Sequence, residues 1–335
     1  MNAKHLTALA ALAAISIAVT AWVLHAGAPT ISSDRRGESV VPSLIAKAND
    51  ITGLSIRDGT GTLVIERRDN RFVESDSGYP VKTEAVSDLV ASTASLAFQE
   101  ARTRDPARYG DLGLADPGDK DGGKEITLRT AGGELADFVV GNRDFSVGGP
   151  TGGTFIRLKG DPQTFLVRGD VRLPTGASDW LVALDLDVKR NEIKKVELTG
   201  GGREGVTASA DPGKPGDLVL AGVPEKRSPD TFKVNRLSSL VESFTFQDVR
   251  KATKPAEDAR RMTVDTSEGL RLVLTSVDDL TKGWVQITAE ATNDATKDKA
   301  KLIASKVEGY AFRVPSSQAE IFGWTIMDLT DEQKS

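Results

Sequence analysis

The sequence feature that most constrains the fold is an internal repeat. Residues 98–102 read FQEAR, and residues 246–250 read FQDVR. Upstream of these blocks, residues 89–92 read LVAS and residues 240–243 read LVES. The first pair of blocks is offset by 148 residues and the second pair by 151, so the second copy lacks three residues between its blocks. Three residues are close to one helical turn, and their loss therefore leaves the same helix face in register.

Two further pairs of blocks follow in the same order along the chain. They are residues 126–130 with 262–266, and Trp180 followed by Asp185-Leu186 with Trp324 followed by Asp328-Leu329. Four pairs in one order predict two tandem copies of a single module, residues 43–187 and 188–331.

The first copy begins with the pattern of a β-hairpin and a helix. Strands are predicted at 53–58 and 62–68, because apolar and polar residues alternate on either side of a glycine turn. A helix is then predicted from a cap at Thr83, with one face formed by Val86, Leu89, Val90, Thr93, Leu96 and Ala97. In the second copy the cap is Asn235 and the face is formed by Leu237, Leu240, Val241 and Phe244.

The rest of the first copy reads as further strands. These are predicted at 125–130, 135–140, 154–158 and 164–168, before a short helix around Trp180. Strands on both sides of a single amphipathic helix are typical of an α+β unit. The predicted fold is therefore two tandem α+β modules, each an antiparallel sheet with one amphipathic helix.

The N-terminus carries a long apolar segment. From Leu6 to Leu24 there are 19 residues without a charge, which as a helix would span about 28 Å, close to the thickness of a bilayer core. Lys4 precedes this segment, which favours an N-terminus in the cytoplasm. The sequence predicts a transmembrane signal-anchor in residues 1–27 and a linker in residues 28–42.

Two other interpretations of this segment stay open. A cleaved signal peptide would end at the small residues 26–28, although Pro29 disfavours cleavage there. A buried core helix fits less well, because no polar face recurs at helical spacing. The first two interpretations place the rest of the chain outside the cytoplasm.

The residue types exclude several classes of function. The chain has no cysteine, and its two histidines, His5 and His25, flank the apolar segment. Catalysis by Ser-His-Asp or Cys-His groups is therefore excluded, as is nearly every zinc site. The formal net charge is −5, with Lys and Arg scattered among Asp and Glu, whereas a nucleic-acid partner requires a concentrated basic face. We expect no catalytic, cofactor-binding or metal-binding residues, no cofactor and no nucleic acid.

Some carboxylates are candidate metal ligands or catalytic acids. Asp185 and Asp187, with Asp179 nearby, have the oxygen ligands that Ca²⁺ or Mg²⁺ prefers. Asp119 and Asp121 precede a glycine pair, but the other ligands of a calcium loop are missing. Solvated surface is the favoured interpretation of both groups. A glycosidase would need two acids in a cleft, and the few Tyr and Trp residues offer little stacking surface for a sugar.

Two other features have a structural interpretation beside a functional one. The glycine-rich run 148–153 lacks the Gly-Lys-Ser/Thr of a phosphate loop and lies between two predicted strands, which favours a hairpin tip and, as a function, a mobile partner contact. Trp180 and Trp324 suit interface anchors, but their repeated position favours core packing.

Several short motifs resemble a known family, the domain-of-unknown-function 4340 family (DUF4340). The motifs are residues 79–81 (YPV), 105–109 (DPARY), 112–114 (LGL), 116–117 (DP), 140–141 (VG), 152–157 (GGTFIR) and 179–181 (DWL). Phe155 departs from the tyrosine more often found at its position. The resemblance implies a bacterial, single-pass inner-membrane protein with its bulk in the periplasm, similar to companions of gliding-motility-type ABC export systems. It implies no catalytic motif.

We therefore expect a non-enzymatic, membrane-tethered periplasmic accessory or interaction protein, an auxiliary to an ABC-type export complex in the inner membrane. The alternative is a protein that binds cell-envelope glycan or lipid in a groove. A third interpretation is a hydrolase that uses carboxylates alone.

Overall fold

The computed structural model describes residues 35–147 and 149–333. Contacts divide the chain into two compact units. Unit 1 comprises the described residues up to Phe72 together with Thr83–Leu173, and unit 2 comprises Val73–Lys82 and the described residues from Pro174 onward. The predicted signal-anchor, residues 1–27, lies outside the described residues. Within the described ranges, no helix is both long and apolar enough to cross a membrane.

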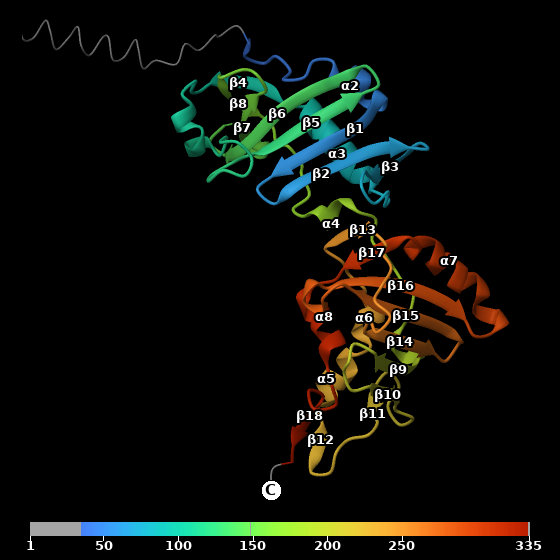
Figure 1. The fold of residues 1–335 in the computed structure, drawn as a ribbon. Helices are drawn as coiled ribbons and strands as arrows, with labels where there is room; N and C mark the ends of the chain where they lie inside the picture. Colours follow the sequence, from blue (N-terminus) through green and yellow to red (C-terminus); the bar gives the residue numbers. More distant parts are fainter. Residues whose placement is uncertain (1–34, 148, 334–335) are drawn as a thin grey trace, which may run out of the picture. The chain divides into compact units, whose positions relative to one another are not determined.

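Unit 1 is an α+β unit, as predicted, and contains an eight-stranded antiparallel sheet (Figure 1). The strand order is β3-β2-β1-β5-β6-β7-β8-β4. The strands are β1 Ile51–Asp58, β2 Gly61–Arg68, β3 Arg71–Glu74, β4 Ala97–Ala101, β5 Lys124–Thr130, β6 Gly133–Asp144, β7 Gly153–Leu158 and β8 Thr164–Arg168. The predicted hairpins are confirmed, since β1 pairs with β2 and β5 pairs with β6.

Unit 2 contains a second eight-stranded antiparallel sheet, ordered β11-β10-β9-β14-β15-β16-β17-β13. Its strands are β9 Ile193–Thr199, β10 Val206–Ala210, β11 Leu218–Leu220, β13 Asp248–Lys251, β14 Arg261–Thr266, β15 Leu270–Val277, β16 Trp284–Ala291 and β17 Tyr310–Arg313. A separate pair joins β12 Arg227–Pro229 to β18 Thr330–Glu332. The two sheets have the same order, so the repeated blocks 126–130 and 262–266 fall on the corresponding strands β5 and β14.

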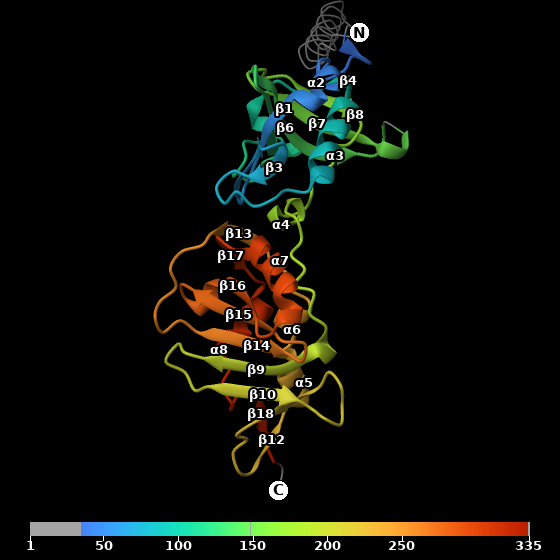
Figure 2. The same cartoon turned by 90° about the vertical axis from the view of Figure 1, so that its right-hand side faces the viewer.

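One amphipathic helix covers a face of the sheet in unit 1 (Figures 1 and 2). This helix, α3 Thr83–Ala94, includes the predicted cap Thr83 as its first residue and buries Val86, Leu89, Val90 and Thr93. It was expected to continue through Leu96 and Ala97, but it ends at Ala94, and Ala97 begins β4. Both residues are buried nonetheless, because the chain turns directly from the helix into the edge strand of the same core. One short helix, α2 Leu44–Lys47, completes the unit. The helix predicted around Trp180 is confirmed as α4 Ala177–Trp180, which belongs to unit 2.

The corresponding helix of unit 2 is broken into α5 Thr231–Arg236 and α6 Ser239–Glu242. The prediction that Asn235 caps it is wrong, because Asp230 accepts the capping hydrogen bond from the Lys233 amide at 3.1 Å. Asn235 instead lies within α5, and its side-chain oxygen accepts from the Leu218 amide at 2.8 Å. This bond satisfies a backbone group of β11 that sheet pairing leaves free at that edge.

Unit 2 has two helices that the sequence did not predict, α7 Lys297–Val307 and α8 Ser316–Gly323. The first lies between β16 and β17, where unit 1 has only a short turn, and packs on β16 and β15 (Figure 2). Its buried residues are Ala300, Ile303 and Val307. The structure also contains short 3-10 turns: η2 Ala48–Asp50, η3 Pro106–Arg108, η4 Gly110–Leu112, η5 Gly149–Thr151, η6 Arg190–Glu192, η7 Leu280–Lys282 and η8 Asp294–Thr296.

Part of the predicted linker, residues 28–42, is packed onto unit 1. The Gly37 amide donates to the Phe98 carbonyl at 2.8 Å, and the Phe98 amide donates to the Glu38 carbonyl at 2.9 Å. Val40 and Val41 are buried, and the Arg35 guanidinium lies 3.9 Å from the ring centre of Phe98. The described part of this segment therefore covers the outer edge of β4, which would otherwise offer unpaired backbone groups.

Candidate functional site

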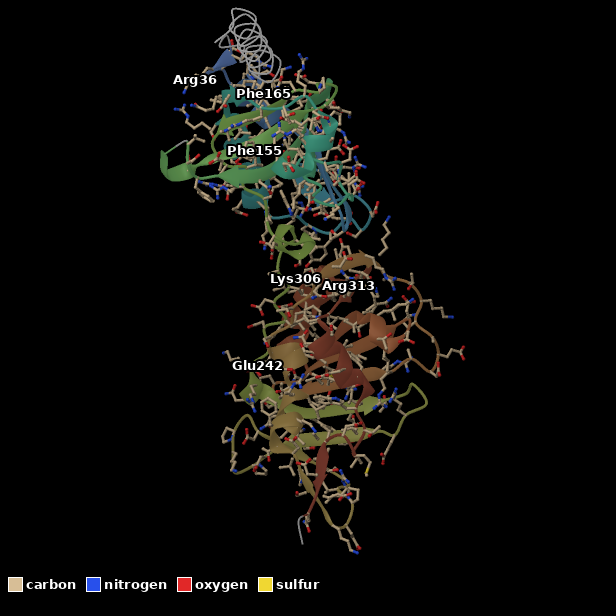
Figure 3. All side chains as sticks on the ribbon, turned by 90° about the vertical axis from the view of Figure 1, so that its left-hand side faces the viewer. Arg36, Phe155, Phe165, Glu242, Lys306 and Arg313 are labelled. Atoms are coloured by element: carbon tan, nitrogen blue, oxygen red, sulfur yellow. The ribbon has the colours of Figure 1, made fainter. Side chains whose placement is uncertain are left out.

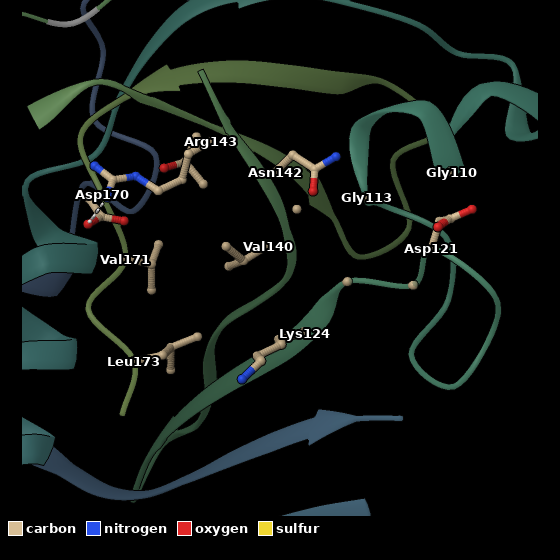
Figure 4. A pocket seen from close by; sticks show the side chains of 14 residues that line it. Gly110, Gly113, Asp121, Lys124, Val140, Asn142, Arg143, Asp170, Val171 and Leu173 are labelled. Carbon is tan, nitrogen blue, oxygen red and sulfur yellow. Dashed lines mark ion pairs between the residues drawn. The ribbon is translucent and has the colours of Figure 1, made fainter. Parts of the chain in front are cut away.

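The candidate functional site is a pocket of about 380 Å³ in unit 1, and five of its fourteen lining residues are glycine (Figure 4). Its walls come from the loop before β5, the middle of β6, the start of β7 and the segment after β8. Figure 4 shows Val140 on one side and Val171 with Leu173 on the other. The lining residues are Gly110, Gly113, Asp121, Gly122, Gly123, Lys124, Val140, Gly141, Asn142, Arg143, Thr154, Asp170, Val171 and Leu173.

An irregularity in β6 shapes this pocket. Val140 pairs with Ile156 and Arg143 with Thr154, so β6 has one more residue than β7 between these pairs. Such a β-bulge interrupts the ladder and bends the strand. The interruption falls at Gly141 and Asn142, where the loop before β5 packs against the sheet.

Close backbone contact requires glycine at two positions in the pocket wall. A Cβ atom at Gly141 would lie 2.3 Å from the Leu112 carbonyl oxygen, and one at Gly123 would lie 2.6 Å from the Val140 carbonyl oxygen. Both distances are far below van der Waals contact, and both obstacles are backbone atoms. Gly113 has a φ of 67°, a left-handed conformation that glycine adopts without strain.

We expect Gly141→Ala to lower the free energy of unfolding of unit 1 by about 1–3 kcal/mol, the usual cost of forcing extra atoms into a packed site. The control is Gly59→Ala in the β1–β2 turn, where the nearest atom to a new Cβ is 3.9 Å away. Thermal unfolding, with amide hydrogen exchange to assign the change to unit 1, measures both. Equal effects of the two substitutions would show that close packing at Gly141 does not matter.

Three of the four charged residues that line the pocket form ion pairs, and the fourth, Asp121, is exposed. Arg143 Nη1 lies 3.1 Å from Asp170 Oδ2, the ion pair drawn in Figure 4, and Lys124 Nζ lies 3.7 Å from Asp58 Oδ2. The Thr60 hydroxyl, and to a smaller extent Lys124, lowers the pKa of Asp58. The buried Thr154 hydroxyl donates to the Gly169 carbonyl at 2.8 Å. The pocket can bind a polar group through its backbone and paired charges, but its lining contains no nucleophile held against a base.

The motifs 105–109, 112–114 and 152–157 form the frame behind this pocket. The Arg157 guanidinium donates to Asp116 Oδ1 at 2.6 Å and to the Leu114 carbonyl at 3.3 Å. It also lies 4.9 Å from the ring centre of Tyr109, whose hydroxyl donates to the Pro162 carbonyl at 2.6 Å. Phe155, labelled in Figure 3, packs against this cluster. These side chains hold the loop in place and lie outside the pocket lining, whereas Gly113 and Thr154 of the same motifs line the pocket.

The motifs 79–81 and 179–181 pair with each other in unit 2, although they are about a hundred residues apart. The Lys82 amide donates to the Trp180 carbonyl at 2.8 Å, and the Val182 amide donates to the Pro80 carbonyl at 3.0 Å. The Tyr79 ring centre lies 5.0–5.7 Å from those of Phe246, Tyr310 and Phe312. Burial raises the pKa of the Tyr79 hydroxyl, which donates to the Val182 carbonyl at 3.1 Å.

Of the candidate metal ligands, Asp179, Asp185 and Asp187 have partners nearby in the sequence or in space. Asp185 accepts from the Asp187 amide at 2.7 Å, and Asp179 accepts from the Gly176 amide at 3.0 Å. Asp187 lies 3.3 Å from Lys299 Nζ. Asp119 and Asp121 are exposed in a surface turn. Across residues 35–147 and 149–333, no group of three His, Cys, Asp or Glu residues is placed to hold a metal ion.

The remaining candidates are structural parts of the fold. The described residues of the run 148–153 include a 3-10 turn, Gly149–Thr151, between β6 and β7, as expected for a hairpin tip. Trp180 is 3% exposed and belongs to the core. Trp324 is half-buried beneath the Arg236 guanidinium, 5.0 Å from its ring centre.

One comparison with known proteins has a result. A family model described as "Domain of unknown function (DUF4340)" matches residues 72–265. This match covers more than half of the 335 residues, includes all the lining residues of the pocket and extends into unit 2. Searches of curated proteins and of solved structures found no match.

Proposed function

The chain belongs to the DUF4340 family, and we propose that it is a non-enzymatic accessory protein, tethered to the bacterial inner membrane, that contacts a membrane complex of the ABC export class. One observation carries the proposal. Three of the four ionisable side chains that line the pocket, Lys124, Arg143 and Asp170, form ion pairs. The fourth, Asp121, is exposed in a surface turn, so the pocket is suited to binding rather than to chemistry.

The pKa shifts of the carboxylates support a role without catalysis. A carboxylic acid that donates a proton near neutral pH requires a raised pKa. The shifted carboxylates among the described residues, Asp58, Asp144, Asp279 and Asp328, all have a lowered pKa. In each case the first cause is a hydrogen bond from a nearby Thr or Ser hydroxyl.

The tether is supported by two features. The uncharged segment Leu6 to Leu24 has the length of a bilayer-spanning helix. Ten residues, 25–34, separate it from Arg35, which stacks on Phe98 of β4. A chain of ten residues spans at most about 35 Å, so the tether would keep unit 1 close to the membrane surface.

Cell fractionation tests the tether. We expect the intact chain in the membrane fraction, resistant to carbonate extraction, with its units digested by protease only after the outer membrane is opened. The matched control replaces Leu12 and Ile15 with arginine, which should release the chain from the membrane because a charge at a bilayer centre costs about 2.5–3.5 kcal/mol. An intact, soluble chain in the cytoplasm would refute the proposal.

Photo-crosslinking in cells tests the partner. A photoreactive amino acid at Asn142, an exposed residue that lines the pocket, should capture an inner-membrane protein. The same substitution at Thr60, exposed in the β1–β2 turn, is the control and should capture much less. Equal yields at both positions, or capture of soluble proteins alone, would contradict an accessory role for this pocket.

A further inference from the structure

Unit 1 contains a second depression, an apolar groove of about 580 Å³ beside α3. Its walls come from α2, η2, the start of β1, the end of β2, β3 and the length of α3. Eight of its thirteen lining residues are apolar: Ile45, Ala48, Ile51, Phe72, Val86, Val90, Ala91 and Ala94. We propose that this groove binds one acyl chain of an anionic membrane lipid, with Arg67 at the headgroup.

The groove has a floor of buried apolar side chains and an exposed apolar residue at its rim. Ile51, Phe72, Val86 and Val90 are each less than a tenth exposed and form the floor. Ile45 on α2 is 75% exposed and lies at the rim, while its neighbour Leu44 is fully buried. The apolar surface of the core therefore continues into the open groove, and covering it would remove that surface from water.

The charge of the lining favours an anion. Arg67 is the one ionisable residue among the described residues that line the groove, and none of them is acidic. Its guanidinium lies 4.8 Å from the ring centre of Phe72, and Nη1 donates to the Asn49 carbonyl at 3.0 Å. A guanidinium carries five N–H donors in a planar fork that matches carboxylate and phosphate oxygens. These contacts hold the planar group beside the apolar floor, with donors remaining for a headgroup.

The size of the groove favours a lipid chain over a protein segment. Its volume is within the range of small-molecule sites, about 300–1,000 Å³. A protein partner would instead need a surface of roughly 800 Å² on each side. Small residues of α3, Ala91 and Ala94, flank the floor, which leaves width for a slender apolar chain. The membrane as the source of this lipid rests on the proposed tether.

Photolabelling of the full chain in nanodiscs tests the inference. The probe is phosphatidylglycerol that carries a diazirine in one acyl chain. We expect adducts, mapped by mass spectrometry, on the segments 44–51 and 83–95. Ala91→Trp, at an exposed position in the lining, should fill the groove and remove these adducts. Asp88→Trp, exposed on the same helix but outside the lining, is the matched control and should retain them.

The headgroup contact has its own variant. Arg67→Gln should reduce labelling by phosphatidylglycerol about tenfold, the loss expected for a charge-assisted hydrogen bond. It should reduce labelling by a second probe, phosphatidylcholine with the same diazirine, much less, because that headgroup has no net charge. Equal labelling of the wild-type groove by both lipids would overturn the anionic preference. Adducts that persist in Ala91→Trp, or a concentration-dependent dimer that Ala91→Trp abolishes, would overturn the acyl-chain assignment.

A separate outcome distinguishes the groove from the tether. If the chain is found free of membranes and yet binds cis-parinaric acid, with loss of binding in Ala91→Trp and Arg67→Gln, the groove assignment stands and the tether fails. If the chain is membrane-bound and its groove takes up neither the phosphatidylglycerol probe nor cis-parinaric acid, the groove assignment fails and the tether stands.

Discussion

Tyr79→Ala is expected to lower the free energy of unfolding of unit 2 by about 3–5 kcal/mol, as for other buried aromatic residues that are cut back to alanine. Tyr79 is 3% exposed and makes edge-to-face ring contacts with Phe246, Tyr310 and Phe312. Its removal would leave a cavity in the middle of this aromatic cluster. Thermal unfolding of the full chain measures the loss, and amide hydrogen exchange assigns it to a unit.

Tyr79 belongs to unit 2, although it directly precedes α3 of unit 1 in the sequence. The position in space therefore predicts a loss in unit 2, whereas the position in the sequence would predict a loss in unit 1. Faster exchange in β16 and β17 is expected, with β5 and β6 unchanged. Tyr79→Phe is the matched control. It retains the ring and removes only the hydrogen bond to the Val182 carbonyl, at a cost of about 1 kcal/mol. A loss confined to unit 1 would refute the assignment.

Arg260→Met is expected to destabilise unit 2 by about 2–4 kcal/mol, because it leaves several backbone acceptors without their donor. Arg260 is 1% exposed. It donates to the carbonyl oxygens of Phe322 and Trp324 at 2.9 Å and of Gly200 at 3.0 Å. It thereby joins the start of β14 to the end of α8 and to the turn after β9.

The buried charge of Arg260 costs free energy and so opposes the stabilisation that its hydrogen bonds provide. Burial, and to a smaller extent Arg203, lowers the pKa of the Arg260 guanidinium, and within the described part of the chain no carboxylate forms an ion pair with it. Methionine would relieve that cost, so the prediction holds only if the lost hydrogen bonds outweigh it.

Chemical denaturation followed by fluorescence measures the balance. Arg261→Met, at the half-exposed neighbour, is the control and should change stability by less than about 0.5 kcal/mol. A neutral or stabilising Arg260→Met would show that desolvation dominates.

Local patterns predicted most of the strands of unit 1. Alternation of apolar and polar residues around glycine turns located β1, β2, β5 and β6 to within a few residues, since side chains of a strand point to opposite faces in turn. The helix α3 was also recognised, because its apolar residues recur at helical spacing. Its end was misplaced, since Leu96 and Ala97 fit both the helix face and the core side of β4.

The sites were harder to predict. The sequence showed the glycines of the pocket, but not that Gly123 and Gly141 meet the same backbone segment. The apolar groove had no signal, because Ile45, Phe72 and Val86 lie on three separate elements. No spacing rule connects residues that meet only after the chain has folded.

The sequence alone determined the type of most elements of unit 1 and the repetition of one strand pattern, because both depend on neighbours along the chain. Only the tertiary structure decided that residues 73–82 belong to unit 2, that Asn235 supports β11 instead of capping a helix, and that residues 37–41 cover the edge of β4. These features depend on which buried rings and backbone groups find partners far away in the sequence, and those partners exist only when the core has formed.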